Sequence, residues 1–132
     1  MELDFLVQLN RYINQQNPFA KSAIGVLGAS ESMSIMAMPG GVEKVFFDGT
    51  RDKAYQVQIN AKSKKQDNCI NVLSSLFQKL ESLIDLPSAN NSYDFQQINI
   101  TSLPSLIMVD EQGFFIYELS ISATITIYEG VV

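Results

Sequence analysis

Closely spaced carboxylates are the first candidates for acid–base chemistry in this sequence. Asp48 stands near Asp52, and Asp110 directly precedes Glu111. Two neighbouring carboxylates can act as general acid and general base when their environments separate their pKa values. Both pairs, however, lie in segments rich in turn-forming residues, where an Asp side chain accepts hydrogen bonds from the nearby backbone. Turn formation therefore explains both pairs better than catalysis does.

Several other kinds of chemistry are excluded by residue type. Histidine is absent and Cys69 is the only cysteine, which removes Cys/His zinc sites, Ser–His–Asp and Cys–His catalysis, and an intrachain disulfide. No Asp-x-Asp-x-Asp calcium loop occurs. The glycine-containing segment 25–30 lacks the Lys-Ser/Thr of a phosphate-binding loop. We therefore expect no catalytic residue, no metal, no cofactor and no enzymatic activity.

Composition and charge narrow the class of partner. The chain has 132 residues, of which 46% are apolar and 17% charged, and its formal net charge is -5. This length predicts a single domain, residues 1–132. A protein that grips DNA by its phosphates needs a basic footprint, and the only basic cluster is Lys62, Lys64 and Lys65. We also expect no signal peptide and no membrane-spanning segment.

Two amphipathic helices are predicted from the spacing of apolar residues. The first covers residues 2–16 and ends at Asn17-Pro18, because a residue before proline is pushed out of the helical conformation. The second covers residues 66–85, ends before Pro87, and places Cys69 on its apolar face as a small buried side chain. Residues 18–30 are expected to form a loop or a short irregular helix.

The remaining segments predict antiparallel strands. Alternating or short apolar runs predict strands at residues 32–38, 42–47, 54–61 and 95–102. The segment Leu103-Pro104-Ser105 suits an edge strand, a bulge or a break before the strand resumes at 106–109. A long strand covers 114–128 and should cross a whole sheet or extend past it. Without strand–helix–strand alternation, these elements predict an α+β fold: an antiparallel β-sheet with two amphipathic helices packed on one face.

An uncharged polar face is expected on this sheet. Gln56, Gln58 and Asn60 alternate with apolar residues on one strand, and Gln96, Gln97 and Asn99 lie on another. Amides can pair across a subunit boundary without the desolvation cost of charges. Two interpretations stay open, a protein interface and a solvent-facing side of the sheet.

The order of these elements resembles a family of small phage proteins. The resemblance rests on the short first helix, the strand Tyr55–Lys62, the long helix, and an ending made of Leu103-Pro104-Ser105, Asp110-Glu111-Gln112-Gly113 and the last strand. It is similar to the tail terminator group, also labelled minor capsid proteins, of tailed phages and prophages of Gram-positive bacteria.

The resemblance implies a structural virion protein at the tail or head–tail junction, assembled in the bacterial host cytoplasm. Family members form a ring, usually a hexamer, that caps the tail tube and docks the head–tail connector, and DNA passes through without specific binding. Expected interface positions are the loop after Pro39 and Gln56, Gln58, Asn60, Asp110, Glu111, Gln112 and Gly113. The alternatives are another head-completion or tail-tube-like virion protein and, less favoured, a small-molecule binding domain or enzyme.

Overall fold

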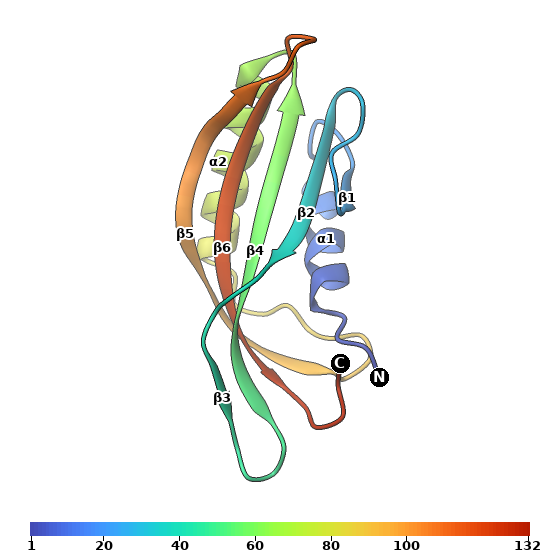
Figure 1. The fold of residues 1–132 in the computed structure, drawn as a ribbon, viewed down its shortest axis with the longest axis vertical. Coiled ribbons are helices and arrows are strands. Elements are labelled where there is room, and N and C mark those ends of the chain that lie inside the picture. Colours follow the sequence, from blue (N-terminus) through green and yellow to red (C-terminus); the bar gives the residue numbers. More distant parts are fainter.

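The computed structural model describes all 132 residues. A helix and four strands are followed by a second helix and two long strands (Figure 1). Their bounds are α1 Phe5–Gln15, β1 Ser22–Ile24, β2 Ser32–Met38, β3 Glu43–Val45, β4 Arg51–Ser63, α2 Gln66–Glu81, β5 Tyr93–Val109 and β6 Phe115–Ile127.

The strands form one mixed, mostly antiparallel sheet. Its order is β1-β2-β4-β6-β5, and β3 pairs with β4 next to β2. Pairing is antiparallel throughout except between β1 and β2. β6 pairs with β4 from Phe115 to Ile127 and with β5 on its other side. This long last strand therefore lies inside the sheet, with a partner strand on each side.

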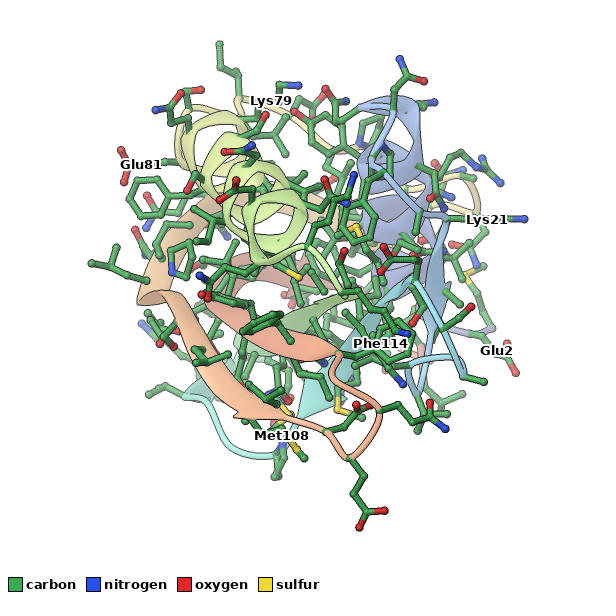
Figure 2. The ribbon with its side chains drawn as sticks, turned by 90° about the horizontal axis from the view of Figure 1, so that it is seen from above. Glu2, Lys21, Lys79, Glu81, Met108 and Phe114 are labelled. Carbon is green, nitrogen blue, oxygen red and sulfur yellow. The ribbon has the colours of Figure 1, made fainter.

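Both helices cover the same face of the sheet, as the view along the strands shows (Figure 2). α1 buries Phe5, Leu9 and Ile13 at helical spacing, and the ring of Phe5 meets Tyr55 edge-on with centroids 5.2 Å apart. α2 buries Cys69, Leu73, Leu76 and Leu80. These side chains join the alternate residues of β2, β4 and β6 in one hydrophobic core.

The structure confirms the predicted α+β fold and differs in details. The segment 18–30 contains the short strand β1, parallel to β2, instead of only a loop or irregular helix. α2 ends at Glu81, before the predicted end at residue 85, so Pro87 is not what stops this helix. β5 runs through Pro104 with local register shifts, so this proline marks a bulge on an edge strand, where its missing N–H is tolerated.

The β3–β4 hairpin extends beyond the helix-covered body of the molecule and forms the lower end in Figure 1. β3 pairs with Arg51–Lys53, which lengthens β4 beyond its predicted start. β2 and β3 lie on the same side of β4, and the link between them passes close to it. The N–H of Ala54 donates to the carbonyl of Val42 at 2.9 Å. A Cβ on Gly41 would lie 2.0 Å from the carbonyl oxygen of Ala54, so the link requires glycine there.

Candidate functional site

The face of the sheet opposite the helices carries mostly uncharged polar side chains, together with Glu118 on β6 and Met36 and Met38 on β2. We call it the open face; alternate positions on three neighbouring strands contribute to it. Its residues are Gln56, Gln58 and Asn60 on β4, Ser120, Ser122 and Thr124 on β6, and Gln97 and Asn99 on β5. The sequence placed the amides on two strands, and the structure shows that β6 lies between those strands with a row of hydroxyl groups.

Hydrogen bonds across the strands orient these amides. Gln56 pairs in register with Ser122, and its Nε2 donates to the Ser122 hydroxyl at 2.8 Å. The amide of Gln58 donates to the carboxylate of Glu118, and Asn60 Nδ2 lies 3.5 Å from the Ser34 hydroxyl. The three predicted β4 residues are half-buried. The open face is therefore a preorganised surface that keeps spare donors and acceptors.

The turn from Asp110 to Gly113 joins β5 to β6, as predicted, between Met108 and Phe114 (Figure 2). Asp110 Oδ1 accepts the N–H groups of Gln112 and Phe114, each at 2.9 Å. The Phe114 hydrogen bond outweighs the opposite effect of desolvation and, with those from Gln112 and Lys62, lowers the pKa of the Asp110 carboxyl. Asp110 therefore builds the turn, whereas the side chains of Glu111 and Gln112 are exposed and free for a partner.

Lys62 connects this turn to the end of the open face. It continues the alternation of Gln58 and Asn60 along β4, and its Nζ lies 3.5 Å from Asp110 Oδ2. The same ammonium donates to the Gly28 carbonyl at 3.1 Å and lies 4.9 Å from the centre of the Phe114 ring. The predicted strand and turn residues thus belong to neighbouring parts of one surface. Lys62 is a structural cation here, not part of a phosphate site.

Two exposed apolar surfaces were not identified from the sequence. One is the tip of the β3–β4 hairpin, with Val45, Phe46 and Phe47. It follows the predicted loop after Pro39 along the chain. The other is the end of β5, where Leu106–Val109 are all exposed. Their apolar character is visible in the sequence, but an apolar run equally suits a buried strand. Only the position of each segment at an edge or tip shows that it is uncovered.

The residues that could carry chemistry have structural roles. Asp48 accepts hydrogen bonds from the hydroxyl and N–H of Thr50, at 2.7 and 3.0 Å, and Asp52 accepts one from Thr126 at 2.7 Å. Cys69 is fully buried; burial, with a smaller contribution from Glu31, raises the pKa of its thiol to about 11. No group of three or more Cys, Asp or Glu residues is placed to hold a metal ion.

The cavities also lack an active-site arrangement. The largest of these by volume, about 490 Å³, is lined by the loop before β5 and the start of β5, and includes Asp85 and Asp94. The Asp94 carboxylate is engaged by the hydroxyl of Tyr128, and the hydroxyl of Tyr93 donates to the Leu86 carbonyl at 2.7 Å. None of the cavities combines a nucleophile with an adjacent base. Neither helix has the length and apolarity needed to span a bilayer.

Comparison with known proteins identifies the family. A family model described as "Bacteriophage tail terminator protein" matches residues 12–127. A search of curated proteins returned no match. The family match covers all six strands, α2, the open face and both hairpins. It implies a structural, non-enzymatic protein of the virion tail that interacts with the tail tube. The chain belongs to the bacteriophage tail terminator family.

Proposed function

We propose that the protein caps the phage tail tube as a hexameric ring and presents a docking surface to the head–tail connector. The family match over residues 12–127 carries this proposal. The ring and the connector contact go beyond that match. Two features support the ring and the connector contact: the amide and hydroxyl side chains of the open face, and the exposed turn residues Glu111 and Gln112.

The open face supports a protein interface. It is a broad sheet surface whose amides and hydroxyls are held in place by the strands, and Glu118 is the carboxylate on it that accepts from Gln58. Amide and hydroxyl groups can exchange water for a protein partner without leaving buried charges unpaired. We therefore assign Gln56, Gln58 and Asn60, and the exposed turn residues Glu111 and Gln112, to contacts with other virion proteins.

The charge of the chain suits the passage of DNA. With a formal net charge of -5, a ring of several copies is strongly acidic. Negative walls repel phosphates and do not trap a translocating duplex. DNA should accordingly pass through the ring without specific binding.

Light scattering over a concentration series, combined with negative-stain images of the largest species, tests the ring. Closed rings of one size would support the proposal. If the free protein is monomeric, the same measurement is repeated with the tail tube protein from the same phage or prophage. Failure both to form rings and to bind that tube would overturn the proposal.

Substitutions on the open face separate its role from folding. Gln56→Lys places a charge beside the Ser122 hydroxyl, where no carboxylate compensates it, and should abolish ring formation or tube binding with little change in the unfolding midpoint. Asn71→Lys is the matched control, because Asn71 is exposed on α2, on the opposite side of the sheet. Equal loss of assembly in both variants would exclude the open face as the interface.

A further inference from the structure

The tip of the β3–β4 hairpin is a rigid apolar knob. Its turn is closed by backbone hydrogen bonds between Phe46 and Thr50, at 2.9 Å, and between Gly49 and Phe46, at 3.1 Å. Glu43 and Arg51 form an ion pair across the hairpin at 3.5 Å. Phe47 is fully exposed at the apex. The hydrogen-bonded turn fixes the backbone that carries Phe47, so binding at this tip orders few additional backbone residues.

A groove of about 370 Å³ lies between α2 and the edge strand β5. Its lining carries no charge and consists of Ile70, Ser74, Phe77, Gln78, Leu103 and Pro104. Pockets of this size accept a small apolar group. The exposed strip Leu106–Val109 follows the groove along the same strand and adds apolar surface beside it. Patches of this kind on a small protein mark sites of association.

The knob and the groove of one chain cannot meet. The hairpin projects at the lower end of the molecule, whereas α2 and β5 run along the flank of its body (Figure 1). Register with β4 fixes the hairpin in that direction. β3 and β5 also each have one strand partner, β4 and β6, so both present a free backbone edge. These two apolar surfaces, each beside an open strand edge, are therefore available for contact between copies.

We propose that a second copy of the chain inserts its Phe47 into the groove between α2 and β5. This inference rests on the proposed function, because it assumes that copies of the chain contact one another in a ring. The contact joins two different surfaces, and a contact of that type repeats from copy to copy and closes into a ring when the rotation allows. It also explains why the hairpin extends beyond the core that stabilises the rest of the sheet.

The expected strength follows from the area. A buried aromatic side chain contributes about 150–250 Å². A stable interface needs about 800 Å² per partner. Phe47 is therefore an anchor within a larger contact, and its loss should weaken self-association at least about tenfold, as the loss of a central aromatic anchor does.

Cross-linking in the full-length protein tests the contact. Val45→Cys, which lies on the same hairpin and leaves Phe47 in place, and Leu103→Cys are made separately, mixed at high concentration and treated with a short bis-maleimide. Cys69 stays silent because it is fully buried. The matched control mixes Val26→Cys with Leu103→Cys, because Val45 and Val26 are 67% and 81% exposed and Val26 lies on a different loop. We expect the Val45–Leu103 pair to form heterodimers at least about tenfold faster than the control pair, as for a specific anchored contact.

Equal cross-linking rates for the two pairs would overturn the inference, whether or not rings form. Rings that form without preferential cross-linking would leave the proposed function standing on a different interface. Phe47→Ser, compared with Val26→Ser, provides the second measurement: loss of self-association only in the first variant supports the contact. A Phe47→Ser variant that self-associates normally but no longer binds the tube would overturn it and assign the hairpin to the tube.

Discussion

Individual carboxylates in this protein organise the backbone. Asp4 joins the start of α1 to the loop before β5: its Oδ1 accepts the hydroxyls of Ser88 and Ser92 at 2.7 and 2.9 Å, and its Oδ2 accepts the Ala89 N–H at 2.8 Å. Asp110 does the same within its own turn. A charged acceptor that replaces water with several fixed donors stabilises the folded state and favours the ionised form.

Replacing Asp4 should therefore destabilise the fold. Asp4→Ala removes the acceptor of these three hydrogen bonds and of a longer one from the Gln8 amide at 3.4 Å, all partly open to solvent, so we expect a loss of about 1–2 kcal/mol in the free energy of unfolding. Urea denaturation followed by circular dichroism measures it. Glu2→Ala is the control, because Glu2 is exposed and its side chain lies outside this network. Equal, negligible losses in both variants would show that the network contributes nothing to stability.

The same network predicts a pH dependence. Burial tends to raise the pKa of the Asp4 carboxyl, but hydrogen bonds from Ser88, Ala89 and Ser92 together lower it below its ordinary value of 3.8. A carboxyl with a lowered pKa in the folded state stabilises the protein above the ordinary value and loses this effect as the pH falls through the lowered one. The difference in unfolding free energy between wild type and Asp4→Ala should shrink below about pH 3.8. A constant difference would contradict it.

Cys69 should be inert in the folded protein. Its thiol is fully buried under α2, and its pKa is raised to about 11. A disulfide reagent such as dithionitrobenzoate, which reacts with the thiolate, should modify it at least about 100-fold more slowly than an exposed thiol. In urea above the unfolding transition it should react at the normal rate. Rapid modification of the native protein would mean that the helix opens locally.

At the level of elements, the link between β2 and β3 is the tightest point of the backbone. Gly40 and Gly41 both have positive φ, at 100° and 87°, but their surroundings differ. A Cβ on Gly40 would have nothing within 4 Å, whereas a Cβ on Gly41 would meet the Ala54 carbonyl. This link lets β2 and β3 follow the same side of β4 while the hairpin continues beyond the body.

Alanine substitutions separate conformational strain from this contact. Gly40→Ala should cost about 1–2 kcal/mol of unfolding free energy, because only the positive φ is unfavourable. Gly41→Ala adds a backbone clash and should cost more, about 3 kcal/mol or above. Thermal or urea denaturation of the two variants gives the comparison. Similar costs would show that the link relaxes away from β4.

At the level of the whole molecule, the distribution of polarity separates the two sides of the sheet. The helix-covered side holds the single hydrophobic core, and the open face holds amides and hydroxyls. Of the basic cluster Lys62, Lys64 and Lys65, Lys62 lies on β4 and is occupied by Asp110 and two backbone carbonyls. No extended positive surface therefore arises from a chain whose net charge is -5.

This distribution predicts no retention of nucleic acid. In an electrophoretic mobility assay at physiological salt, duplex DNA should migrate unchanged in the presence of the free protein or its ring, because counterion release from phosphates needs a basic footprint. Stable, salt-sensitive binding would contradict the proposed passage of DNA through an inert channel. A basic DNA-binding protein in a parallel lane confirms that the assay detects binding.

Local sequence patterns predicted most of the secondary structure. Spacing of apolar residues located both helices, period-two alternation located β4 and β6, and the turn at Asp110 was predicted, because these features depend on neighbours along the chain. The absence of histidine and the single cysteine exclude Cys/His zinc sites and the Ser–His–Asp and Cys–His kinds of catalysis by residue type alone. The polar side of Gln56 and Gln58 followed from the same alternation.

Features that depend on contacts between distant segments could not be predicted from local patterns. The position of β6 between the two amide-bearing strands is set by non-local pairing, which no local pattern encodes. The same holds for the parallel pairing of β1 and for the exposure of Phe47 and Leu106, because an apolar run is buried or exposed according to what packs on it. Local periodicity fixes which face of a strand is apolar, whereas the packing of distant segments decides which apolar faces are left for a partner.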